Sequence, residues 1–154
     1  MKYFTLALLV LSLFTSCKKS NPGPNIYSLQ VTIDGDSSWS TSNVNTTRYS
    51  NYTYISATRG TTGEKIDLTI TNFSGINTYQ IHNTGPSTGT SSGLNTNMSS
   101  GEYVGFGIVS GFIAVTGSIS VTKVTDNAVY GTFYFSNTNK GGGAASGSFI
   151  APHP

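Results

Sequence analysis

The sequence predicts an all-β protein folded as a single antiparallel β-sandwich, with a lipocalin-like β-barrel as the alternative. Three observations lead to this fold class. No segment keeps the apolar period of about 3.6 residues that marks an amphipathic helix. Apolar residues alternate with polar ones in short runs rich in Val, Ile, Thr, Tyr and Phe, bounded by Gly, Asn and Asp. The connections between these runs are too short for the helical crossovers that parallel strands need.

The strand pattern recurs along most of the chain after its first 26 residues. Trp39, the only tryptophan, is expected to close one end of the core. The low-complexity stretch 83–101 separates two groups of strands, and its composition favours a linker over a functional lid. The predicted strands are residues 27–33, 39–44, 52–59, 64–71, 77–82, 102–109, 112–124, 128–136 and 144–150.

Residue parity predicts the register of the last long hairpin. Partners across an antiparallel pair must lie on the same face, so Ile119 should face Phe133 and Gly117 should face Phe135. A two-residue turn would break this parity. We therefore expect a three-residue loop, 125–127, whose last residue is an asparagine in the left-handed conformation.

In an earlier hairpin, one register gives suitable partners to both the charged and the apolar residues. A four-residue loop, Gly60–Gly63, would pair Arg59 with Glu64 and Ala57 with Ile66. Opposite charges and apolar side chains then meet across the strands, as stable antiparallel pairs require.

The first 17 residues have the pattern of a bacterial lipoprotein signal. A lysine at position 2 precedes the apolar run 4–14, which is too short to span a bilayer. Thr15 and Ser16 then lead into Cys17, the only cysteine. The alternative is a plain secretory signal with an incidental cysteine. We expect residues 1–16 to be a signal peptide, Cys17 to carry the lipid (diacylglycerol and an acyl chain such as palmitate), 17–25 to be a flexible tether, and 26–154 to form the all-β domain.

Charged residues make up only 9% of the chain, and the formal net charge is +2. No basic stripe is present, so nucleic acid is not expected as a partner. The expected partner is a membrane, reached through the lipid anchor, in the bacterial cell envelope and specifically at the outer membrane. The leaflet and the oligomeric state stay open.

The titratable residues give little support to catalysis or metal binding. Asp34 and Asp36 flank a glycine and could hold Ca²⁺, but an ordinary Asp-Gly turn explains them better, because the full calcium-loop pattern is absent. His82 and His153 have no second ligand at metal spacing. The chain has no nucleophile motif. We therefore expect no catalytic residues, no metal, no cofactor and no enzymatic activity.

Tyrosines are the better functional candidates. Strand parity turns Tyr52, Tyr54, Tyr130 and Tyr134 away from the core, so they could contribute to a ligand-contacting surface. The alternative is ordinary packing of tyrosines on the outer face of a sheet, since strands favour this residue.

Four segments carry a resemblance to a known group of proteins. They are VTIDGDSSW (31–39), GEKIDLTITNFSGINTYQI (63–81), GSISVTKVTDNAVYGTFYF (117–135) and ASGSFIAP (145–152). Together they resemble a domain-of-unknown-function family of small all-β bacterial lipoproteins. The resemblance implies a sandwich or barrel lipoprotein and supplies no catalytic residues.

These observations predict a non-enzymatic binding or scaffolding module for a glycan, a peptide or a partner protein. The alternative is a lipocalin-like carrier that holds a small apolar ligand inside a barrel, which would require an internal cavity of about 300 Å³ or more.

Overall fold

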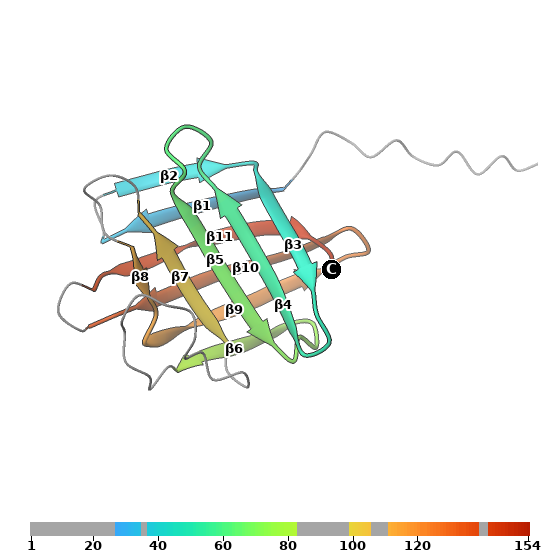
Figure 1. The fold of residues 1–154 in the computed structure, drawn as a ribbon. Helices are drawn as coiled ribbons and strands as arrows, with labels where there is room; N and C mark the ends of the chain where they lie inside the picture. The colour runs from blue at the N-terminus through green and yellow to red at the C-terminus, as the bar shows by residue number, and fades with distance from the viewer. Residues whose placement is uncertain (1–26, 35–36, 83–98, 106–110, 139–141) are drawn as a thin grey trace, which may run out of the picture.

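The computed structural model describes residues 27–34, 37–82, 99–105, 111–138 and 142–154. All regular structure in these ranges is β, in eleven strands that form two antiparallel sheets (Figure 1). Within the same ranges, no helix is long and apolar enough to cross a membrane. The predicted signal peptide, Cys17 and the tether lie outside the described residues.

The strands divide between a six-stranded and a five-stranded sheet. The six-stranded sheet has the order β2 (Ser37–Thr41), β1 (Ser28–Ile33), β11 (Ala144–Pro152), β10 (Ala128–Ser136), β9 (Thr116–Val124), β6 (Asn77–His82). The five-stranded sheet has the order β3 (Val44–Arg48), β4 (Tyr52–Thr58), β5 (Lys65–Thr71), β7 (Ser100–Val104), β8 (Phe112–Ile113).

The two sheets pack face to face as the predicted β-sandwich, and the barrel alternative is wrong. Neither sheet closes on itself, and a parallel bridge between Ile81 and Ser99 links them at one corner. The inner faces supply one hydrophobic cluster, in which Leu68 and Phe135 are fully buried. Trp39 joins this cluster from β2, as predicted. Side chains therefore occupy the space that a lipocalin-like fold would keep for a ligand.

The predicted register of the β9–β10 hairpin is confirmed. Ile119 faces Phe133 and Gly117 faces Phe135. The predicted three-residue loop is wrong. Thr125 closes on Ala128 through a backbone hydrogen bond of 2.8 Å, which leaves a two-residue turn whose asparagine has no positive φ.

A β-bulge restores the parity that this short turn would break. The register shifts between Tyr130 and Gly131, so that Tyr130 faces Lys123 while Gly131 faces Val121. Thr122 is the extra residue on the bulged strand, as β-bulges place two residues opposite one.

The other predicted hairpin is confirmed throughout. Ala57 faces Ile66 across β4 and β5. Beside the turn, Arg59 Nη1 lies 2.6 Å from Glu64 Oε2.

The strand boundaries depart from prediction in two places. The segment 39–44 was expected to be one strand, but the chain bends at residues 42–43, and β3 follows as a separate edge strand in the other sheet. The segment 112–124 is likewise divided into β8 and β9, which belong to different sheets. Most of the predicted linker, residues 83–98, and the end of the strand 102–109 lie outside the described residues.

Candidate binding surface

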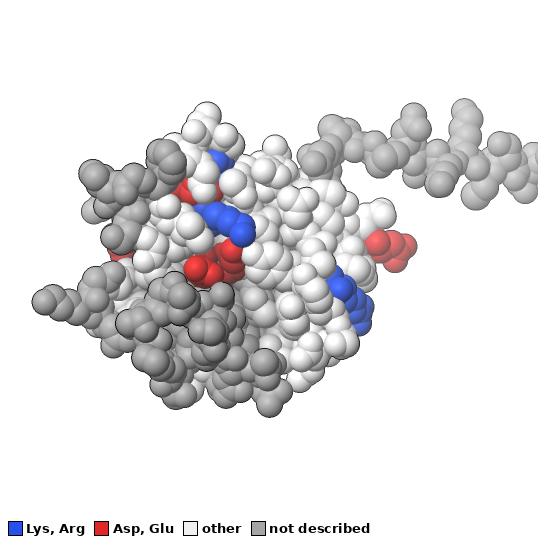
Figure 2. Space-filling view, viewed as in Figure 1, with Lys and Arg blue, Asp and Glu red and all other residues white. Residues whose placement is uncertain are grey.

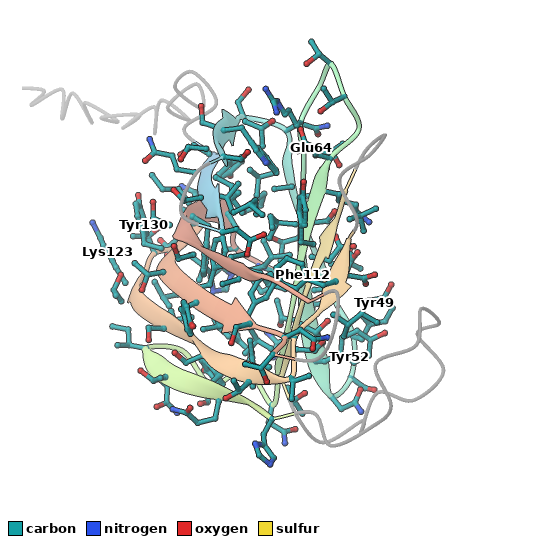
Figure 3. The ribbon with its side chains drawn as sticks, turned by 90° about the vertical axis from the view of Figure 1, so that its left-hand side faces the viewer. Tyr49, Tyr52, Glu64, Phe112, Lys123 and Tyr130 are labelled. Atoms are coloured by element: carbon teal, nitrogen blue, oxygen red, sulfur yellow. The ribbon has the colours of Figure 1, made fainter. Side chains whose placement is uncertain are left out.

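The four candidate tyrosines lie on opposite sides of the molecule. Tyr52 and Tyr54 project from the outer face of the five-stranded sheet, whereas Tyr130 and Tyr134 project from the outer face of the six-stranded sheet. Figure 3 shows Tyr52 on one side of the sandwich, Tyr130 on the other, and Phe112 between the sheets. The structure therefore does not bring the two pairs together into one surface.

Three of the four tyrosines have local partners. Tyr52 stacks on Tyr49, with 4.4 Å between ring centroids. The Tyr54 hydroxyl accepts a hydrogen bond of 3.1 Å from Lys65 Nζ. Lys123 Nζ lies 5.0 Å from the centre of the Tyr130 ring (Figure 3). These contacts fit the packing alternative for those three residues.

Tyr134 differs from the other three tyrosines. It is 51% exposed, more than most large apolar or aromatic side chains of the fold. In the part of the chain that the structure describes, its ring stacks on no other ring and lies under no cation. Tyr134 is therefore the aromatic residue most available to a ligand.

Tyr134 belongs to a continuous array of uncharged polar side chains, which we call the hydroxyl face. The array consists of two cross-strand rows on the outer face of the six-stranded sheet, and every member carries a hydroxyl or an amide. One row is Ser38, Thr32, Ser146, Tyr134, Ser118 and Gln80; the other is Ser40, Gln30, Ser148, Thr132, Ser120 and Thr78.

Some members of the hydroxyl face bond to one another across strands. Thr32 and Ser38 are joined by a hydrogen bond of 2.9 Å between their hydroxyls, and Thr78 and Ser120 by one of 3.0 Å. The face contains no charged side chain, because Lys123 lies in the next row beside Tyr130. Its chemistry is thus limited to neutral hydrogen bonding and one exposed ring.

A groove of about 560 Å³ opens on this face over β2, β1 and β11. Most of its lining side chains are short, and Tyr134 borders it as the cross-strand neighbour of Ser146. The polar lining residues are Gln30, Thr32, Ser38, Ser40, Ser146 and Ser148. Val31, Trp39 and Gly147 complete the lining. The groove thus offers many neutral donor and acceptor groups beside the exposed ring of Tyr134.

The Glu64 carboxylate, at the end of the β4–β5 hairpin, has a structural role. It accepts hydrogen bonds from the hydroxyls of Tyr103 and Thr62, each of 2.8 Å, as well as from Arg59. Burial alone would raise the pKa of Glu64, but these bonds outweigh it and lower the pKa. Burial and the bond to Glu64 raise the pKa of Tyr103 to about 12. Every contact in this network is internal.

The remaining candidates from the sequence have local roles or lie outside the described residues. The Asp34 carboxylate accepts a hydrogen bond of 2.7 Å from the Ala144 backbone N–H, and Asp34 adopts a φ of 51°. Asp34 therefore acts as a turn residue that joins two loops. Asp36 lies outside the described ranges. His82 and His153 are both exposed, and no group of three or more potential metal-ligating side chains forms within the described ranges.

Sequence reasoning identified Tyr134 but missed the hydroxyl face around it. Its signal is the Ser, Thr or Gln at alternate positions of β1, β2, β9 and β11. These positions can be recognised as one surface only when the order of the strands is known.

Comparisons with protein-family models, with curated proteins and with solved structures find no match to this chain. Its fold and surface define an antiparallel β-sandwich with an uncharged groove on the outer face of one sheet.

Proposed function

We propose that this protein is a non-enzymatic glycan-binding module of the bacterial envelope that holds a neutral saccharide chain against the hydroxyl face. The observation that carries the proposal is the uncharged groove of about 560 Å³ beside the exposed Tyr134 ring. Neutral sugars present hydroxyl groups, which pair with Ser, Thr and Gln side chains, and C–H faces, which pack on an aromatic ring.

The composition of this face favours a glycan over a protein or a peptide. Protein–protein interfaces are enriched in aromatic residues, Met and Arg and depleted in Ser, whereas four of the nine residues that line this groove are serines. An extended peptide usually pairs with the edge strand of a sheet, where backbone groups are free, and not with its face. The carrier alternative needs an interior cavity, and here the interior is filled by the core cluster.

Binding should depend on Tyr134. In a chain that lacks residues 1–16 and carries Cys17→Ser, Tyr134→Ser is expected to weaken binding to neutral polysaccharides about tenfold, which corresponds to the loss of an aromatic contact of about 1.4 kcal/mol at the border of the groove. An array of dextrans, mannans and glucans, with charged polysaccharides alongside, identifies the ligand, and calorimetry measures its affinity.

Two further variants make this test specific. Ser146→Trp, which fills the groove, should abolish binding, while Tyr52→Ser, on the opposite sheet, should leave the affinity unchanged. The free energy of unfolding of Tyr134→Ser should stay within about 0.5 kcal/mol of the parent, as for other surface substitutions. Equal loss of binding in Tyr52→Ser and Tyr134→Ser would refute the proposed surface.

The envelope location is part of the same proposal and rests on the sequence around Cys17. A lipidated Cys17 would hold the domain at the outer membrane, since two or more acyl chains give stable attachment. Cells fed labelled palmitate should label the natural protein, and Cys17→Ala should abolish that label and release the protein from the membrane fraction. Equal labelling of both proteins would contradict the anchor.

A further inference from the structure

Two carboxylates face each other across neighbouring strands on the outer face of the five-stranded sheet. Asp67 on β5 is the direct partner of Glu102 on β7. Like charges directly opposite in a sheet are unfavourable, and in this chain Arg59 and Glu64 show the usual opposite-charge pairing. When both are ionised, the two carboxylates repel each other, and a cation bound between them would remove that repulsion.

Lys65 neutralises only part of this charge. Its Nζ lies 2.7 Å from Asp67 Oδ2. One ammonium against two carboxylates leaves one negative charge when both acids are ionised. Figure 2 shows Lys or Arg and Asp or Glu side chains gathered over β5 and β7.

The second oxygen of Asp67 has no partner. Asp67 is only 8% exposed, and its Oδ1 is buried without a hydrogen bond from any residue that the structure describes. The Tyr54 hydroxyl lies in the same polar cluster and accepts a hydrogen bond of 3.1 Å from Lys65 Nζ. Buried polar atoms are nearly always satisfied, so an orphaned carboxylate oxygen indicates a missing donor or cation.

Asp67 and Glu102 line one pocket of about 260 Å³. The same pocket is lined by Tyr54, Thr69 and Ser100, each of which carries a hydroxyl. Two carboxylates and three hydroxyls form an all-oxygen set, with no imidazole or thiol in the lining.

We propose that this pocket binds a calcium ion, which Asp67 Oδ1 and the Glu102 carboxylate hold with hydroxyl and water oxygens completing the shell. Ca²⁺ takes six to eight oxygen ligands in irregular geometry, whereas Mg²⁺ demands a near-ideal octahedron. With only two carboxylates the affinity should be that of extracellular calcium modules, with Kd on the order of 10⁻⁴–10⁻³ M. Lys65 contacts the other carboxylate oxygen of Asp67, Oδ2, and so holds the side chain in place.

Terbium luminescence tests the site directly, because Tb³⁺ substitutes for Ca²⁺ and a nearby tyrosine such as Tyr54 sensitises its emission. The intact mature chain should give saturable emission that Ca²⁺ displaces and Mg²⁺ displaces far less well. Asp67→Asn and Glu102→Gln should each weaken Tb³⁺ binding at least tenfold. Asp126→Asn, in the exposed β9–β10 turn, and Ser146→Trp, in the groove of the other sheet, should leave it unchanged.

Thermal unfolding separates a cation site from a merely structural pair. In a chelator, Glu102→Gln should melt at or above the natural protein, because it removes the repulsion with Asp67. In millimolar CaCl₂ the natural protein should gain several degrees and Glu102→Gln none. Absence of saturable Tb³⁺ emission, equal displacement by Mg²⁺, or the same calcium response in Glu102→Gln would overturn the proposal.

Discussion

Gly117→Ala is expected to destabilise the domain by about 3–5 kcal/mol, as the sum of backbone strain at a positive φ and overpacking between two strands. Gly117 has a φ of 149°, which side chains rarely adopt. An added Cβ would overlap the Tyr134 carbonyl oxygen and lie 2.6 Å from Phe135 Cα. Both obstacles belong to the central strand β10, so they cannot move aside without loss of sheet pairing.

Urea unfolding of Gly117→Ala beside Gly60→Ala measures this effect with its control. Gly60 lies in the β4–β5 turn, has no atom within 4 Å of a built Cβ and has no strained φ. Its replacement should change the free energy of unfolding by less than about 0.5 kcal/mol. Comparable small losses in both variants would mean that β9 can slide away from β10.

Phe133→Ala should cost about 3–5 kcal/mol, the usual range when a buried aromatic side chain is lost. The Phe133 ring is 4% exposed and stacks on Phe135, with 5.8 Å between centroids. It also covers Gly147 on β11, where a Cβ would lie 2.8 Å from the ring. Because the ring contacts both Phe135 on its own strand and Gly147 on β11, no single side-chain rearrangement can fill the cavity left behind.

Thr132→Ala is the matched control for Phe133→Ala, since the two residues are adjacent on β10 and point to opposite faces. Thr132 is exposed, and its loss should cost well under about 1 kcal/mol. The comparison requires only denaturant midpoints and slopes. If both variants lost similar stability, the outer face of the six-stranded sheet would have to be covered, and the hydroxyl face would not be free for a ligand.

Parity arguments predicted the faces and registers of the hairpins because they use only neighbouring strands. The pairing of Ile119 with Phe133 was predicted from the alternation of apolar residues together with a three-residue loop, and the structure reaches the same register through a shorter turn and a bulge. The turn was mispredicted for the same reason: parity is satisfied either by a longer loop or by a bulge at Thr122. The local twist of the strands decides between the longer loop and the bulge, and no residue type in the sequence predicts the bulge.

The parts that could not be predicted depend on long-range strand order. Tyr54 and Tyr134 are equivalent by parity, but their strands belong to different sheets. Strand β3 was missed because, as an edge strand, it buries only Val44 fully. The opposition of Asp67 and Glu102 was equally invisible, since β5 and β7 are far apart in the sequence and meet only in the folded sheet.

The pairing of the first and last strands places both ends of the folded domain at the same end of the sandwich. Ser28 at the start of β1 lies opposite Ile150 near the end of β11, whereas Asp34 and Ala144 meet at the other end of the same pair. With Cys17 held in a bilayer, nine residues would lie between it and Tyr27, an extended reach of roughly 35 Å. The carboxyl terminus would then lie at the tethered end of the sandwich, and Asp34 at the opposite end of the same strand pair. A reporter fused at Pro154 would therefore lie nearer the point of attachment than one placed beside Asp34.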